Sequence, residues 1–410
     1  MKGNAIKKFN LRSLFPGILP LFILAHFGHH IVSGILTPLM PMIRSDLNLN
    51  YTQAGILLSA FALTGGISQL PAGWLADHIG PRIVVSVGIS GVALAGVLIG
   101  LSQTYGMLII FLVLMAALGG GYHPAATAAI SSSVNPVIRG RALGTHLIGG
   151  SASNFLAPLL AAGIALVWGW RGSYITLAVP TIALGVAIYV LLGRQKGMKV
   201  TDTQITATTD SNNETQPAPH RLHRLILFLV LSLSIGALMH SVRAFIPLYM
   251  VDHFGVREEA AAAIIAIIPF AQMFGGPLGG YLSDRFGRIP VMLVASFLTS
   301  PLIYLLSSVP YGLGFGATLV IMGIINASRM PTSEAYLVSE APARRRSTIL
   351  GIYYFTGREI GGLLTPVMGY FIDRFGFTSS FNMVSAALLT VAVICSMIFW
   401  SIRDRSHLQL

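Results

Sequence analysis

Hydrophobic residues occur in long runs along this chain, and short polar segments separate the runs. About 20 apolar residues in a helix are enough to cross a hydrocarbon layer roughly 30 Å thick, since each residue adds about 1.5 Å. The pattern therefore predicts an all-α membrane protein with twelve transmembrane helices. The predicted spans cover residues 17–42, 51–75, 82–102, 106–131, 142–168, 173–193, 223–250, 258–282, 289–308, 311–337, 348–371 and 379–402.

A polar hairpin between the second and third runs returns in the second half of the chain. GWLADHIGPR at 73–82 is matched by GYLSDRFGRI at 280–289, so Asp284 follows Asp77 by 207 residues. The same offset relates three further pairs of residues: Pro124 and Pro331, Arg139 and Arg346, and Gly144 and Gly351. We therefore expect two pseudo-symmetric six-helix bundles, 1–193 and 223–410. A polar cytoplasmic linker, 194–222, joins them. Such repeats are typical of transporters that bind substrate near the bilayer midplane.

Composition and charge placement support a membrane location. Hydrophobic residues make up 54% of the chain, charged residues only 10%, and the mean hydropathy is +0.74. Soluble domains carry about 25% charged residues. The net charge of +12 does not indicate nucleic-acid binding, because nineteen Lys and Arg residues fall on one side of the predicted spans and four on the other. This bias predicts a bacterial inner-membrane protein with both termini in the cytoplasm.

The repeated hairpin resembles the signature of the major facilitator superfamily, G-x-x-x-D-x-x-G-R-R, and the resemblance extends over essentially the whole chain. Pro81 stands where a basic residue is usual. The resemblance implies the major facilitator fold, alternating access, and a gating role for the hairpin residues. The gating candidates are Asp77, Gly80, Arg82, Asp284, Arg285, Gly287 and Arg288. The alternative is a polar loop that only helps to set the topology. A similar sequence, Asp373–Gly376, falls in an outer loop, and we interpret it as a degenerate echo.

Two further segments narrow the resemblance. GGGYHPAATAAISSS and HLIGGSASNFLAPLLAA are similar to the fosmidomycin-resistance type of drug exporter. The second segment carries small residues and Pro158 at a spacing that resembles the family's antiporter signature, which implies export. Tight helix packing is the alternative explanation for the small residues.

Ionisable side chains inside membrane spans are costly and usually functional. The first half has no Asp or Glu within a span but contains several histidines, of which His26, His29 and His30 share one helix face. The second half contains three arginines and two glutamates in the interior of its spans. We expect a cavity with a histidine-lined wall and an arginine-rich wall. The predicted substrate-binding residues are His26, His30, Tyr122, His123, His146, His240, Arg243, Arg329 and Arg358.

Proline residues mark the centres of these two walls. Pro124 removes a backbone hydrogen bond and bends the helix beside His123, and Pro331 does the same beside Arg329. Two kinks at equivalent positions of the repeat favour a site between the halves, although a kink that only serves helix packing is the alternative.

Several roles are open to the charged residues. Guanidinium groups match carboxylate and phosphonate groups, which favours an anionic substrate. Glu334, Glu359 or His30 could carry a coupling proton, since burial favours the protonated carboxylate and an imidazole changes charge near neutral pH. Alternatively, Arg329–Glu359 and Arg358–Glu334 pairs only stabilise the fold. No metal site is expected, because no carboxylate accompanies the histidines in their half.

The sequence thus predicts a secondary transporter that performs proton-coupled export of a small anionic or amphiphilic compound. A proton symporter that imports an organic acid or sugar is the main alternative, and a non-transporting membrane sensor is a weaker one. An enzyme is not expected, since no nucleophile–base pair or P-loop stands out. The expected partners are a small-molecule substrate, protons and the lipid bilayer, with no nucleic acid and no cofactor, and the chain is expected to function as a monomer.

Overall fold

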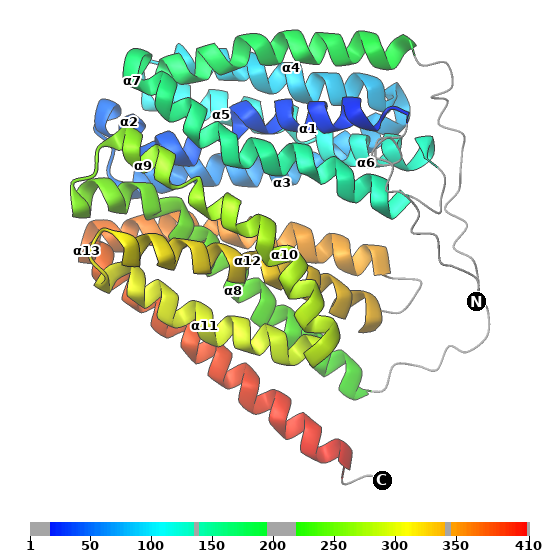
Figure 1. Ribbon diagram of the computed structural model, residues 1–410, viewed down its shortest axis with the longest axis vertical. Helices are drawn as coiled ribbons and strands as arrows, with labels where there is room; N and C mark the ends of the chain where they lie inside the picture. Colours follow the sequence, from blue (N-terminus) through cyan, green and yellow to red (C-terminus); the bar gives the residue numbers. More distant parts are fainter. Residues whose placement is uncertain (1–16, 135–138, 195–218, 341–345, 408–410) are drawn as a thin grey trace, which may run out of the picture.

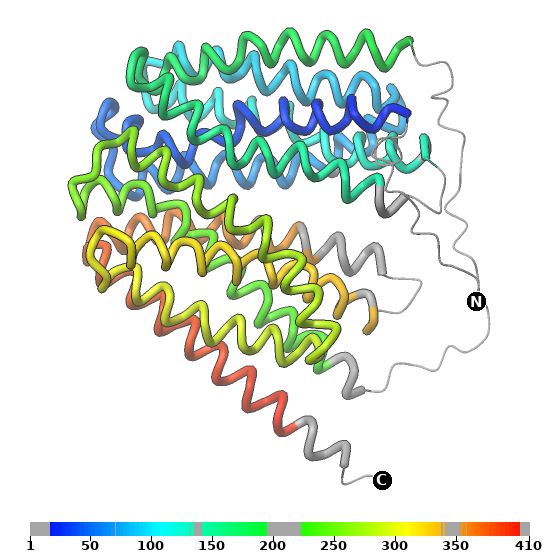
Figure 2. Tube along the Cα trace, viewed as in Figure 1, coloured from blue at the N-terminus to red at the C-terminus, as the bar shows by residue number. Residues whose placement is uncertain are grey.

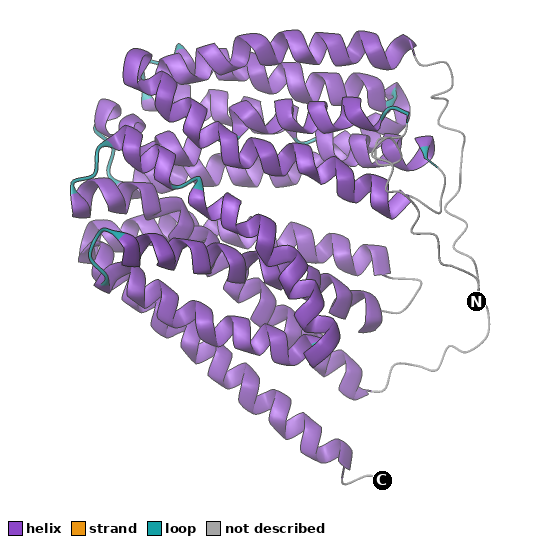
Figure 3. Cartoon of the chain, viewed as in Figure 1, coloured by secondary structure: helices purple, strands orange, loops and turns teal. Residues whose placement is uncertain are grey.

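The computed structural model describes residues 17–134, 139–194, 219–340 and 346–407. In these residues every regular element is an α-helix, and the connections are short (Figure 3). Most of the linker predicted at 194–222 lies outside the described residues.

The first half of the chain forms seven helices, drawn from blue to green in the upper part of Figure 1. They are α1 (Leu19–Ser33), α2 (Leu36–Leu47), α3 (Tyr51–Ile79), α4 (Pro81–Gly100), α5 (Tyr105–Gly119), α6 (Tyr122–Ser133) and α7 (Arg139–Arg194).

The second half forms six helices, most of which are drawn in the lower part of the same view, while α9 lies beside α2 of the first half. They are α8 (Pro219–Phe254), α9 (Glu258–Ile264), α10 (Ile267–Phe286), α11 (Arg288–Ser308), α12 (Leu313–Glu340) and α13 (Arg346–His407). The two halves follow one another along the Cα trace (Figure 2), and α9 packs against α2 and α7 of the first half.

The number of membrane crossings follows from helix length and two breaks. Within the described residues, nine helical segments are long and apolar enough to span a membrane, or ten when the bent α3 is included. Two of these segments, of 53 and 47 residues, are too long for one crossing. Each is interrupted by one non-helical glycine, Gly169 in α7 and Gly376 in α13. Dividing both at these glycines gives twelve spans, and the predicted fold class is confirmed.

The 207-residue repeat is also present in the backbone. Residues with positive φ recur as pairs at this offset: Asn48 with Gly255, Gly80 with Gly287, and Gly169 with Gly376. Gly80 and Gly287 both have a φ of 88°, with ψ of 145° and 154°, so the two polar hairpins turn in the same way. A glycine adopts this conformation without the clash that a Cβ would cause.

Close helix packing in the second half depends on small residues. Gly275 and Gly279 on α10 face α12, where a Cβ on either residue would collide with backbone atoms, those of Ile324 for the first and of Ser328 for the second. Small residues four apart allow helices to approach this closely inside a membrane. The neighbouring Gly276 faces open space. The α10–α12 contact therefore tolerates no side chain at two of these three glycines.

We expect Gly279→Val to destabilise the protein by at least about 1–3 kcal/mol, because the α12 backbone cannot move aside as a side chain would. Thermal unfolding of the detergent-purified protein measures the effect as a lower midpoint temperature. Gly276→Val is the matched control, since it makes the same change to the same helix without a collision. Equal effects of the two substitutions would contradict the packing argument.

Candidate functional site

The two halves are joined at one end of the bundle by a helix cap supplied across the interface. The first backbone N–H groups of a helix have no partner within the helix. In α3 the N–H groups of Tyr51 and Thr52 donate to the carboxylate of Asp373 in the other half, at 2.9 and 2.8 Å. Asn50 accepts from the N–H of Gln53 and completes the cap from within the first half. A negative charge at a helix N-terminus is also favoured by the helix dipole.

A second polar contact lies beside this cap. Arg44 at the end of α2 forms a salt bridge of 2.9 Å with Asp252 at the end of α8. The hydroxyl of Tyr51 donates to the same carboxylate at 2.8 Å, and the guanidinium of Arg44 lies 4.1 Å above the Tyr51 ring. We call the region of Arg44, Tyr51, Thr52, Asp252 and Asp373 the closed end.

Small residues bring α3 and α13 into backbone contact next to the closed end. A Cβ on Gly55 would lie 2.8 Å from the carbonyl oxygen of Thr365, and one on Gly369 would collide with the backbone of Tyr51. Because each glycine is on a different half, both halves contribute to the close approach. The closed end is therefore sealed by packing as well as by hydrogen bonds.

The predicted gating hairpins lie at the opposite end of the helices. Asp77 is roughly 35–40 Å from Tyr51 along α3. Asp77 and Asp284 are both exposed. Arg82 donates to the carbonyl of Tyr189 on α7 at 2.8 Å and lies 3.9 Å above its ring. Arg285 donates to the hydroxyl of Tyr281 within α10. We call this region the hairpin end.

A pocket opens beside the second hairpin. Its volume is about 720 Å³. Charged and polar residues from five helices contribute to its lining, among them Arg224, Asp284, Arg288, Glu340 and Ser396. The pocket shows that the second copy of the signature, including Gly287, borders a cavity of small-molecule size.

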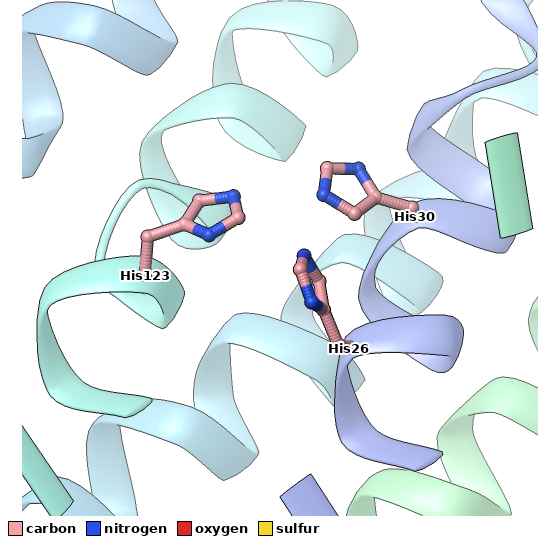
Figure 4. A group of neighbouring side chains, drawn as sticks. All are labelled: His26, His30 and His123. Carbon is pink, nitrogen blue, oxygen red and sulfur yellow. The ribbon is translucent and has the colours of Figure 1, made fainter. Parts of the chain in front are cut away.

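Several histidines of the first half gather in its interior. His26 and His30 extend from α1 towards His123 on α6 (Figure 4). His26 is buried, and its Nδ1 donates to the carbonyl oxygen of His146 on α7 at 3.1 Å. The rings of His26 and His146 also stack, with centroids 4.3 Å apart. Four of the predicted site residues are thus brought together by α1, α6 and α7.

Tyr122 packs beside this histidine cluster. Its side chain is fully buried, and its hydroxyl donates to the carbonyl oxygen of Phe22 on α1 at 3.2 Å. Its ring stacks on His29, whose Nδ1 donates to the carbonyl oxygen of Gly88 on α4. Tyr122 therefore holds α6 against α1 instead of presenting a free hydroxyl to a ligand.

Arg329 lies at the centre of a polar cluster in the second half. Its guanidinium donates to the backbone oxygen of Ser232 on α8 at 2.7 Å and to the Ser232 hydroxyl at 3.3 Å. That hydroxyl also lies 2.9 Å from the hydroxyls of Ser333 and Tyr353. Gly236 leaves room for the guanidinium against α8. The hydroxyls and the carbonyl orient the positive charge without neutralising it.

Glu359 reaches from the second half to the first. It is on α13, is only 8% exposed, and its carboxylate lies against α3, where a Cβ on Gly66 would collide with it. Glu334 and Arg243 are half-buried on α12 and α8. The ring of His240 lies against Gly361 of α13. The side chain of Arg358 lies outside the described part of the chain, and the pairing of Arg329 with Glu359 stays a prediction.

Asp373 is the functional residue that sequence reasoning missed. The sequence suggested only a degenerate echo of the hairpin at Asp373–Gly376, whereas in the structure the Asp373 carboxylate caps α3 across the interface between the halves. An acidic residue in an outer loop gives no such signal by itself. Only the fold shows that it meets the N-terminus of another helix.

The fold and these interior charges define a membrane transporter built from repeated spanning helices, and not an enzyme. The chain belongs to the major facilitator superfamily, whose profile matches residues 22–366 and 227–409.

Named relatives agree with this assignment. The multidrug resistance protein MdtG of Klebsiella pneumoniae (strain 342) is 24% identical over 372 residues, which cover 88% of each chain. MdtG of Escherichia coli O6:K15:H31 (strain 536 / UPEC) is 26% identical over 372 residues, 88% of this chain and 89% of its own length. Among solved structures, a bacterial homolog of the human lysosomal transporter Spinster matches the fold with a TM-score of 0.77. It has 18% sequence identity, and the match covers 96% of this chain and 97% of that one.

We expect Asp373→Ala to weaken the closed end, because two N–H groups of α3 lose their acceptor. A lost cap costs about 0.5–2 kcal/mol, which changes the ratio of closed to open molecules roughly 2- to 30-fold. Spin labels at Gln103→Cys and Leu313→Cys, in a Cys395→Ser background, report the distance between the halves by double electron–electron resonance. In Asp373→Ala, a larger fraction of molecules should show a longer distance between the labels.

Asp46→Ala is the control for this experiment. Asp46 forms a salt bridge at the same end, but its partner is Arg171 in the same half. Its loss should leave the distance distribution unchanged. An identical response of the two variants would show that the cap does not hold the halves together.

Proposed function

We propose that this transporter exports a small anionic or amphiphilic compound in exchange for protons, in the manner that the resemblance to fosmidomycin-resistance exporters implies. The observation that carries the proposal is the oriented guanidinium of Arg329, held by Ser232 inside a membrane bundle. Within the described residues, the donors of this interior positive charge contact hydroxyl and carbonyl oxygens and no carboxylate, which suits an anionic ligand. The multidrug resistance relatives support export over import.

The conformation, with one end closed, is consistent with the binding of substrate from the cytoplasm. With the termini in the cytoplasm, as the Lys and Arg bias predicts, the closed end faces outwards and the hairpin end faces inwards. The cap on α3 then blocks exit to the outside. Asp77 and Asp284, exposed in this state, are the residues that would form contacts when the inner side closes.

Glu359 is our choice for the coupling group. Its carboxylate is buried and touches α3 of the other half, so a rocking motion of the halves changes its surroundings. A carboxylate that alternates between a packed interface and water gains and loses a proton as the protein changes state. Glu334 and His30 are the alternatives. One chain holds both halves of the pathway, which is consistent with a functional monomer.

The first test measures fosmidomycin accumulation and tolerance in an efflux-deficient bacterium. Wild type should lower accumulation, and Asp77→Asn or an uncoupler should abolish the effect. Raised accumulation under an inward proton gradient would instead support the import of an organic acid or sugar.

Arg329→Gln should reduce transport about 10- to 100-fold, as expected for the loss of a hydrogen bond to a charged group. Export rate at several substrate concentrations is the readout, and the apparent affinity should fall. Arg257→Gln removes one positive charge at an exposed position and is the control. If both variants transport equally well, Arg329 does not bind the substrate.

Glu359→Gln should abolish substrate movement driven by a proton gradient while substrate exchange across the membrane continues. The amide keeps the size of the side chain but cannot release a proton. Reconstituted vesicles with and without an imposed gradient separate the two activities. Gradient-driven transport that survives in this variant would exclude Glu359 as the coupling group.

A further inference from the structure

We propose that His26, His30 and His123 form a binding site for a divalent transition-metal ion of the zinc type. The ligand nitrogens of these three side chains lie within 4.8 Å of one another. Three imidazoles and one further ligand make a complete tetrahedral set for zinc. This inference goes beyond the transport activity proposed above, because it assigns a metal site to the first half.

The arrangement of the rings matches three ligands on one ion. A zinc–nitrogen bond is about 2.0–2.1 Å, and the ring centre lies about 1.1 Å behind the nitrogen, so rings on one tetrahedral ion have centroids roughly 5.2 Å apart. The observed centroid separations are 5.0 Å for His26–His30, 5.3 Å for His26–His123 and 5.4 Å for His30–His123. The triangle is nearly equilateral.

The hydrogen bond of His26 gives its ring the tautomer that a metal ligand needs. A carbonyl oxygen can only accept, so the contact with the oxygen of His146 places the proton of His26 on Nδ1. The lone pair is then on Nε2, the nitrogen that points towards His30 and His123 (Figure 4). A hydrogen bond from the second ring nitrogen to a backbone carbonyl is the usual support of a metal-binding histidine.

The other aromatic rings nearby are held in different ways. His146 stacks on His26 at an angle of 19°, and His29 stacks on Tyr122 at 12°. The three rings of the proposed site are inclined to one another by 40° to 82°. The His29 ring is also inclined to His30 and His123, by 74° and 84°, but its Nδ1 donates to the carbonyl oxygen of Gly88. Non-parallel rings can direct their nitrogens at a common point, whereas stacked rings cannot.

The absence of a carboxylate, which led the sequence argument away from a metal, does not prevent binding. Neutral imidazoles are sufficient ligands, and the helix spacing of His26 and His30 is that of paired zinc ligands on one face. An ion on three neutral ligands keeps its double positive charge. Its fourth position then favours an oxygen anion or water.

The test measures metal binding by the full-length protein, purified in detergent with a tag that contains no histidine. Co²⁺ serves as a spectroscopic probe, because nitrogen ligation gives visible absorption bands, and Zn²⁺ is titrated by calorimetry. Wild type should bind one equivalent of ion. His30→Gln and His123→Gln should each raise the dissociation constant at least about tenfold.

His78→Gln is the control for surface histidines, since His78 is exposed near the hairpin end. The His78→Gln variant should bind Zn²⁺ with the affinity of wild type. Zn²⁺ should also raise the unfolding temperature of wild type but not of His123→Gln, a comparison that remains valid if the variant is less stable without metal. Wild type without stoichiometric binding, or variants with unchanged affinity, would overturn the proposal. Neither result depends on the substrate or on the direction of transport.

Discussion

The first N–H groups of α3 have no acceptor within the helix, and this requirement influences how the two halves of this transporter meet. A helix N-terminus needs acceptors, and among the described residues of its own half a side chain supplies one to α3 only for the N–H of Gln53. The carboxylate of Asp373 supplies the acceptors for Tyr51 and Thr52 from the other half. The glycines on α3 and α13 then let the two backbones approach, and the buried Glu359 lies along the same pair of helices. One requirement of helix chemistry thus connects the seal at one end with the proposed coupling group.

The sequence allowed most of the fold to be predicted, because membrane crossing imposes length and hydrophobicity on each helix. The twelve apolar runs correspond to the helical spans, and the breaks inside α7 and α13 fall between predicted runs. The 207-residue offset found in the hairpins returns in the left-handed backbone of Gly169 and Gly376. These features depend on local or periodic sequence patterns, so they can be predicted from the sequence.

The contacts between distant helices could not be predicted in the same way. Asp373 and Thr52 are more than 300 residues apart, and no spacing rule relates them. The histidines show an intermediate case. The shared face of His26 and His30 follows from helix periodicity, but the approach of His123 depends on how α6 packs on α1. Tyr122 is a further case, since the sequence places it in the predicted site but does not show that its side chain is fully buried against α1.

The location of the seal has a mechanical consequence. If the halves rotate about the closed end, the histidine and arginine clusters lie between that pivot and the hairpin end. A rotation of the halves about the closed end displaces these clusters less than it displaces the hairpins of Asp77 and Asp284. A wide mouth at one face therefore requires only a small widening at the level of Arg329. In the proposed export cycle, such a movement would admit the ligand from the hairpin end while the closed end still blocks the exit.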